Sequence, residues 1–406
     1  MSKKRFALAS AVAAAALAVS GFAVPAHAAG KTLTIWADST RTPVLKKLVA
    51  AWATANNVTV NVVSQTDTNS NFQAAAPKGV GPDLIIGAHD WTGTLAASGL
   101  IEPMTGVSTG LFDSGSISAF SYNGRLWGVP FGTENIALVT NLNLVPAGAP
   151  TTWASLESTA LALKAAGKTT SGLFIPCGGA NSCDPYHHAF LNFGLGGYVF
   201  QNKSGRLNPK DVGLASKAFL ANAGLVDKWV SEGLISKESA TGDDYSFKTF
   251  FTNKAPFMIT GPWELADIKK SGVPYQISMI PNPLGTGNAA PFAGYQGVYL
   301  SHYSTNRLLA RQFINQVVST DTFQLGLYND QGRPPALLSA IKSISGDKDL
   351  AGFAAAGVGA TPMPNIPQMG SVWTDFGNAW GAVLTGKLKT AAAFTQATAN
   401  IKKLIG

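Results

Sequence analysis

The chain has 406 residues, of which 46% are hydrophobic, 10% aromatic and 13% charged, with 43 glycines and a formal net charge of +8. After the N-terminus, no run of basic residues is longer than two. Nucleic-acid binding depends on clustered Lys and Arg, so this pattern gives it no support, while the apolar fraction is high enough for a folded core.

The first 28 residues are typical of a secretory signal peptide. Three basic residues at positions 3–5 precede an apolar run over 6–24, and Ala26-His27-Ala28 offers a cleavage site after Ala28. A membrane anchor is the alternative, but Ser20-Gly21 and Pro25 interrupt the run. We therefore expect export to the periplasm or the cell surface, without a lipid-attachment cysteine near the cleavage site, and a mature net charge of +5.

The 378 residues left after cleavage exceed the usual size of one core, so we expect two lobes. Alternation over 31–36 predicts a strand, Thr42-Pro43 begins a helix, and strands follow over 58–62 and 82–86. This order predicts an α/β lobe with a largely parallel sheet, whose ligands bind beyond the carboxyl ends of strands. The polar and aromatic residues at those ends are Asp38, Arg41, His89, Asp90 and Trp91.

The second half of the chain predicts another lobe. Apolar periodicity over 214–230 predicts a helix that Gly233 ends, residues 255–259 form a strand before Trp263, and residues 292–300 form a strand that crosses between lobes. No long flexible linker separates the halves, so several crossing strands would form a hinge. We expect residues 29–134 and 293–335 in an N-terminal lobe, and residues 135–292 and 336–406 in a C-terminal lobe.

The two cysteines, Cys177 and Cys183, lie in the exported part of the chain, where a short-loop disulfide is favoured over two thiols. This disulfide would stiffen the approach to Asp184-Pro185-Tyr186. The alternative is a metal site made by both cysteines with His187 and His188, although their spacing fits no common zinc pattern. We expect neither a metal nor a cofactor.

Three aromatic residues follow conformationally stiff segments. Trp373 comes after the loop 363–369, whose two prolines fix the backbone, and prolines also precede Trp263 and Tyr186. We interpret the three as surfaces for stacking sugars. The alternative is that each is a core aromatic beneath a loop.

Seven short segments now point to a family. The chain resembles the family-1 extracellular solute-binding proteins of ABC importers, most of all the maltose/maltodextrin-binding proteins, from about residue 31 to 405. The segments that carry the resemblance, in the family's order, are 33–36, 81–85, 88–90, 122–126, 211–213, 261–263 and 363–369 with Trp373.

The resemblance implies two hinged α/β lobes that close on a sugar as a monomer and deliver it to the membrane permease subunits of an ABC importer. It assigns stacking to the three aromatics and hydroxyl binding to three carboxylates. Arg41 stands where the maltose binders have a lysine. The ligand-binding residues it implies are Trp263, Tyr186, Trp373, Glu134, Asp90, Asp184, Arg41 and Tyr245.

The N-terminal lobe departs from the family's pattern. The family's tryptophan two residues before His89 is Gly87 here, the arginine after Asp90 is Trp91, and an aspartate before Arg41 is Thr40. Trp91 either replaces the missing stacking surface or only caps the lobe. These departures leave the exact sugar more open than the sugar class.

Three other functions compete with maltodextrin import. A glycoside hydrolase would need two carboxyls about 5 to 10 Å apart around one bond. Glu134 and Asp90 could be proposed, but the resemblance gives them binding roles, so we expect no enzyme. A binder of another oligosaccharide class, or a secreted carbohydrate adhesin or sensor without an importer, would have a similar cavity.

Overall fold

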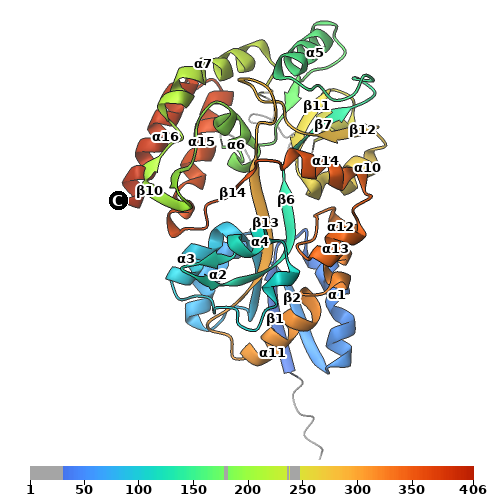
Figure 1. Ribbon diagram of the computed structural model, residues 1–406, viewed down its shortest axis with the longest axis vertical. Helices are drawn as coiled ribbons and strands as arrows, with labels where there is room; N and C mark the ends of the chain where they lie inside the picture. The colour runs from blue at the N-terminus through green and yellow to red at the C-terminus, as the bar shows by residue number, and fades with distance from the viewer. Residues whose placement is uncertain (1–30, 178–181, 236, 238–246) are drawn as a thin grey trace, which may run out of the picture.

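The computed structural model describes residues 31–177, 182–235, 237 and 247–406, which form two lobes (Figure 1). The predicted signal peptide and the proposed ligand residue Tyr245 lie outside this part of the chain. Helices and mixed sheets occur in both lobes, so the predicted two-lobed α/β fold is confirmed.

The N-terminal lobe is built on the predicted strand, helix, strand order. Strand β1 (Lys31–Ala37) pairs in parallel with β2 (Val58–Ser64) and β3 (Leu84–Ala88), and α1 (Thr42–Ala55) packs on β2. Pro43 occupies the first turn of α1, where its missing N–H costs nothing. The sheet is mixed rather than largely parallel, because β13 (Phe292–Leu300) returns from the other lobe antiparallel to β3.

The core of this lobe gathers apolar residues from the sheet and from the helices that cover it. It includes Leu33, Val44, Leu84, Phe313 and Phe323. The other elements of the lobe are α2 (Thr68–Ala75), η1 (Ala76–Lys78), η2 (His89–Trp91), α3 (Thr92–Ala97), η3 (Thr109–Leu111), α4 (Ser114–Ala119), β4 (Ser121–Tyr122), β5 (Arg125–Leu126), α11 (Arg307–Phe313), η6 (Ile314–Val318), α12 (Asp321–Gln331) and α13 (Leu338–Ser343).

Two long antiparallel strands join the lobes. Figure 1 shows β6 (Gly128–Asn135) and β13 running side by side through the centre of the molecule. Phe292 at one end of β13 packs in the C-terminal core, whereas Val298 and Leu300 pack in the N-terminal core. Strand β13 is the crossing strand that the sequence predicts over residues 292–300, whereas β6 was not predicted as a strand.

The C-terminal lobe contains a four-stranded sheet and the helices that cover it. Its strands are β12 (Tyr275–Ser278), β7 (Ala137–Asn141), β11 (Phe257–Thr260) and β8 (Leu173–Phe174), in that order. Helix α7 (Lys217–Glu232) ends at Gly233 in the left-handed conformation, as the sequence predicts. The remaining elements are α5 (Trp153–Ala165), α6 (Pro185–Gly194), β9 (Phe200–Lys203), β10 (Arg206–Val212), α9 (Lys248–Phe251), η5 (Pro262–Glu264), α10 (Leu265–Ser271), α14 (Lys348–Ala356), β14 (Thr361–Pro362), η7 (Pro367–Ser371), α15 (Trp373–Leu384) and α16 (Thr390–Ile405).

Two segments differ from their expected course. The loop after β14 is extended only as far as Ile366, because Pro367 starts the short helix η7, and Trp373 then opens α15.

The second segment lies at the expected lobe boundary after residue 335. Ala336, Leu337 and Ala340 pack in the N-terminal core. We therefore propose that the last crossing between the lobes follows α13, and not residue 335.

No helix in the described residues has the length and hydrophobicity needed to cross a membrane.

Candidate functional site

A cavity of about 440 Å³ opens where the two lobes face each other beside the crossing strands. It is concave and lined by aromatic, apolar and charged side chains, which is the usual character of a small-molecule site. Eight of the nine ligand residues expected from the sequence line it, and the ninth, Tyr245, lies outside the described residues. The lining residues are Arg41, Ala88, Asp90, Trp91, Glu134, Asp184, Tyr186, His187, Trp263, Gln296, Arg333, Met363 and Trp373.

The first turn of α6 places Asp184 and Tyr186 at the cavity. Asp184 caps the helix by accepting from the Tyr186 backbone N–H at 2.9 Å, and Pro185 follows at the first helical position. Its other oxygen accepts from His187 Nδ1 at 2.7 Å. Burial raises the pKa of Asp184, but the interactions with His187 outweigh it and hold that pKa below its usual value. Asp184 therefore stays ionised at the cavity wall.

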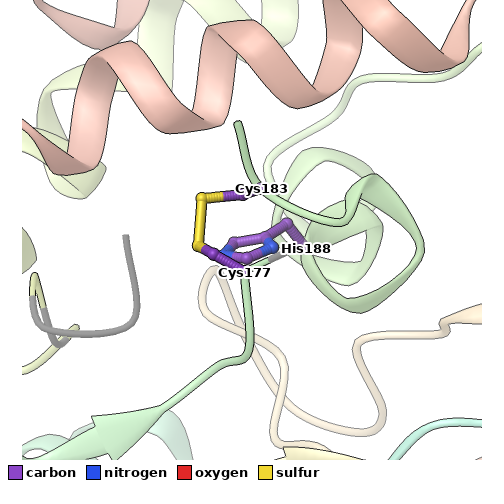
Figure 2. A group of neighbouring side chains, drawn as sticks. All are labelled: Cys177, Cys183 and His188. Carbon is purple, nitrogen blue, oxygen red and sulfur yellow. A yellow bond between two sulfur atoms is a disulfide. The ribbon is translucent and has the colours of Figure 1, made fainter. Parts of the chain in front are cut away.

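The predicted disulfide between Cys177 and Cys183 is confirmed, directly before this turn (Figure 2). His188 lies beside it, and the three side chains offer donor atoms within 4.8 Å of one another. Both sulfurs are consumed by the disulfide, and His187 turns to Asp184 instead. The four residues of the predicted metal alternative thus make other interactions in this structure. The cysteines form a disulfide, and His187 and His188 bond to the side chain and the backbone carbonyl of Asp184.

Trp263 forms one aromatic wall of the cavity, and Gly261 allows its position. A Cβ added at Gly261 would lie 2.2 Å from the Trp263 ring, so only a glycine at position 261 lets this ring lie against the backbone there. Tyr186 lies 6.0 Å from the same ring between centroids, at a tilt of 56°. The missing side chain at Gly261 therefore allows this orientation of the Trp263 ring.

Trp91 forms a second wall by the same device. A Cβ at Gly87 would lie 1.8 Å from Cζ3 of Trp91, so the ring covers the backbone of Gly87. The Trp91 ring therefore occupies the space that a side chain at position 87 would fill. The ring lines the cavity, which is the position that a stacking role requires. Contact with a ligand remains a prediction.

We expect Gly87→Ala to weaken ligand binding by about tenfold, because the new methyl group displaces the Trp91 ring from the cavity wall. Isothermal titration calorimetry with the best-binding sugar measures this change. Gly110→Ala is the matched control, since a Cβ at Gly110 meets no atom within 4 Å. Equal affinities in the two variants would show that the Trp91 ring contributes nothing to binding.

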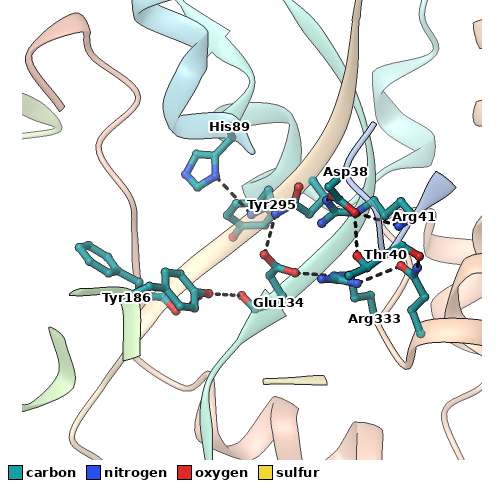
Figure 3. Close-up of polar contacts among 11 residues, drawn as sticks. Asp38, Thr40, Arg41, His89, Glu134, Tyr186, Tyr295 and Arg333 are labelled. Carbon is teal, nitrogen blue, oxygen red and sulfur yellow. Dashed lines mark hydrogen bonds and ion pairs between the residues drawn. The ribbon is translucent and has the colours of Figure 1, made fainter. Parts of the chain in front are cut away.

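The Glu134 carboxylate is held on both oxygens by neighbouring side chains (Figure 3). Gln296 Nε2 donates to Oε1 at 2.7 Å, and Arg333 Nε donates to Oε2 at 2.9 Å. The Tyr186 hydroxyl donates to the Glu134 backbone carbonyl at 3.2 Å, which ties α6 to the crossing strand β6. Glu134 is therefore a fixed acceptor, with only its remaining lone pairs available to a ligand.

Arg333 and Gln296 are cavity residues that the sequence reasoning missed. The Arg333 guanidinium carbon lies 5.7 Å from the centroid of the Trp263 ring, a cation–π distance. Arg333 precedes Pro334-Pro335, so it lies beside a stiff proline segment, the same kind of signal that marked the three aromatics. Gln296 lies within the crossing strand β13, where no local pattern distinguishes it.

Arg41 reaches the cavity as expected, and Asp38 is its partner. The guanidinium Nη1 forms an ion pair with Asp38 Oδ2, whereas Arg41 Nε is buried and has no hydrogen-bond partner among the described residues. Thr40 donates to the same carboxylate at 2.7 Å. Asp38, two residues before Thr40, thus supplies the acidic partner of Arg41.

Asp90 differs from the other carboxylates because no cation accompanies it in the described residues. Its side chain accepts from Trp373 Nε1 at 3.0 Å, a bond that joins the two lobes. The residue is only 8% exposed. Burial raises the pKa of Asp90 to about 6, against the opposing effect of the Trp373 bond. A buried charge without a partner destabilises the protein and leaves a strong acceptor at the cavity.

We expect Asp90→Asn to stabilise the unliganded protein near neutral pH by about 1–3 kcal/mol, while an amide oxygen still accepts from Trp373. An acid whose folded pKa is raised binds extra protons when folded, so its contribution to stability is present at low pH. It is lost as pH rises through about 6. Thermal unfolding of Asp90→Asn and of the unsubstituted protein, measured at acidic and at neutral pH, tests this. A stability difference that does not grow between acidic and neutral pH would contradict it.

The loop after β14 docks against the N-terminal lobe. Asn365 Nδ2 donates to the backbone carbonyls of Ala119 and Ser121, both at 2.8 Å. His89 Nδ1 accepts from the Tyr295 backbone N–H at 3.2 Å, which leaves Nε2 to donate to the Met363 carbonyl at 3.0 Å. Burial lowers the pKa of His89 to about 4, so this neutral form persists near pH 7. His89 is a structural residue that links the lobes.

Comparison with known proteins places this geometry in context. The sequence model of a family described as bacterial extracellular solute-binding protein matches residues 47–355. A maltodextrin-binding protein of Bacillus subtilis is 28% identical over 99% of this chain and 98% of its own length. A galactooligosaccharide-binding protein of the same organism is 26% identical over 92% and 89%. A maltotriose-binding protein of Pyrococcus abyssi is 26% identical over 78% and 68%.

Proposed function

The chain belongs to the bacterial extracellular solute-binding proteins, and from this premise we propose that it binds a maltodextrin-type oligosaccharide between its lobes and delivers it to the permease of an ABC importer. Two of the relatives named above bind maltodextrin or maltotriose. A third binds galactooligosaccharide, which makes that sugar class the second candidate.

The observation that carries the proposal is the alternation of flat aromatic surfaces and charged groups around one cavity. A sugar ring has faces of C–H groups and an edge of hydroxyls. Trp263, Tyr186, Trp373 and Trp91 offer rigid surfaces for the faces. Polar atoms at the edges of these rings can pair with hydroxyls, which is necessary because a buried hydroxyl without a partner costs roughly 1–3 kcal/mol.

Ligand binding would also couple the lobes. Asp90, Trp91 and Arg41 come from the N-terminal lobe, whereas Tyr186 and Trp263 come from the C-terminal lobe. A sugar that contacts both groups binds the closed arrangement better than an open one. Such a difference in affinity is what shifts a protein toward closure.

Calorimetry against maltose, maltotriose, trehalose, cyclodextrin, xylooligosaccharides and galactooligosaccharides tests the proposal. We expect the α-glucans to bind most tightly. Tighter binding of galactooligosaccharide would support the second candidate, for which the altered Trp91 wall provides a structural reason. No binding to any sugar in the panel would contradict the proposed function.

The family is one of solute-binding proteins, and we propose that this chain likewise has no hydrolytic activity. Both Glu134 oxygens accept hydrogen bonds, one from Arg333, and such a carboxylate is poorly suited to donate a proton as a general acid. Incubation with maltooligosaccharides should release no reducing ends beyond the stoichiometry of the protein. Release over many turnovers would show that it is an enzyme.

Deletion of the gene distinguishes a role in transport from a role in adhesion. We expect loss of the gene to abolish uptake of the bound sugar, because the family works with ABC permeases. Normal uptake with reduced surface binding would favour a carbohydrate adhesin or sensor.

A further inference from the structure

We propose that the wall around Asp90 makes the cavity prefer an oligosaccharide that carries an ammonium group over its neutral counterpart. This inference rests on the proposed function and specifies the chemistry of the ligand. It arises because the other acidic side chains around the cavity bond to basic side chains, whereas Asp90 does not.

In the part of the chain that the structure describes, every other carboxylate at or beside the cavity is bonded to a basic side chain. Arg41 pairs with Asp38, Arg333 pairs with Glu134 at 2.9 Å, and His187 bonds to Asp184 at 2.7 Å. Among the described lining residues, the cavity therefore has no excess positive charge that would attract an anionic sugar.

Asp90 remains without a cation in the described part of the chain. Its only side-chain donor there is Trp373 Nε1, a neutral group that bonds to Oδ2. The charged group that affects it electrostatically is Glu134, which is also an acid. The residue that follows Asp90 in the sequence is Trp91, whose ring lies in the cavity wall and supplies no charge. An ionised Asp90 thus faces a ligand with its charge uncompensated.

The aromatic surroundings of Asp90 also suit a cation. Trp91 adjoins it in the chain, Trp373 bonds to it, and both rings line the same cavity. Indole faces attract ammonium groups, more strongly where water is excluded. A sugar ammonium at this wall would meet a carboxylate and aromatic surfaces together.

A neutral sugar can also bind here, by donating a hydroxyl to Asp90. The two cases differ in strength, because both hydrogen bonds have an ionised acceptor but only the ammonium adds the attraction between two opposite charges. An ammonium in place of the correct hydroxyl should therefore raise the affinity about tenfold, and one at any other position should lower it.

Maltoses in which one hydroxyl is replaced by an amino group provide the test. Calorimetry near neutral pH compares each of them with maltose on the full-length mature protein. We expect at least one to bind about tenfold more tightly than maltose. The advantage should fall to about twofold or less in Asp90→Asn and persist in Asp67→Asn, a carboxylate that caps α2 away from the cavity.

The outcomes separate this inference from the proposed function. Tight binding of maltose with weaker binding of every amino derivative would overturn the inference alone. An advantage that persists unchanged in Asp90→Asn would also overturn it. If no maltose-type sugar binds but the glucosamine disaccharide chitobiose binds more tightly than its neutral counterpart cellobiose, the ammonium preference holds and the maltodextrin assignment fails.

Discussion

Trp263→Ala is expected to weaken oligosaccharide binding by about a hundredfold, corresponding to roughly 2–3 kcal/mol. The ring lies against Gly261 and is flanked by Tyr186 and Arg333, so its orientation is fixed before a ligand arrives. Truncation removes a preorganised stacking surface and the aromatic partner of the Arg333 guanidinium. Calorimetry with the tightest-binding sugar of the panel measures the loss.

Two further variants control this experiment. Trp263→Phe keeps an aromatic face and should retain most of the affinity. Trp52→Ala removes a tryptophan that packs on Phe313 in the N-terminal lobe, away from the cavity, and should leave the affinity unchanged. Unchanged binding in Trp263→Ala would mean that the ligand binds elsewhere.

Arg333→Met is expected to lower the free energy of unfolding by about 3–5 kcal/mol. The ion pair with Glu134 is buried, with side-chain exposures of 12% for Arg333 and 8% for Glu134. Loss of the guanidinium leaves a buried carboxylate whose remaining side-chain donor among the described residues is Gln296. Chemical denaturation of the unliganded protein measures the effect.

The surface pair of Arg307 and Glu102 offers a matched comparison. Arg307 is 49% exposed and lies 3.8 Å from the carboxylate, so Arg307→Met should change stability by about 1 kcal/mol or less. The double variant Arg333→Met with Glu134→Gln should recover part of the stability lost in Arg333→Met, because it also removes the unpaired charge. Equal losses in Arg333→Met and Arg307→Met would show that the Glu134 pair is not the source of the effect.

Local patterns in the sequence predict the elements and several cavity residues well. Alternation and helical periodicity are properties of adjacent residues, and β13 spans the predicted residues 292–300. Prolines before Trp263 and Tyr186 mark rigid positions because they restrict the backbone nearby. The structure brings these aromatics into one cavity.

Partners that are distant in sequence could not be predicted in this way. Arg333 and Gln296 reach Glu134 across 199 and 162 residues, and only the paired crossing strands and the loop beside them bring the three together. The position of the Trp91 ring depends instead on the local turn from β3 into η2, which local sequence patterns also did not predict. The sequence shows that Gly87 and Trp91 depart from the family's pattern, but the distance between them shows that one residue fills the space left by the other.

The docking of the loop after β14 has a kinetic consequence. Asn365 and His89 fasten this loop to the N-terminal lobe, so separation of the lobes must break three hydrogen bonds together, of which the His89 bond is buried. Where release of a ligand requires the lobes to separate, it can be no faster than the opening of these bonds. Sugars of different affinity would then share one upper limit on their dissociation rate, and its temperature dependence would reflect the loop rather than the sugar.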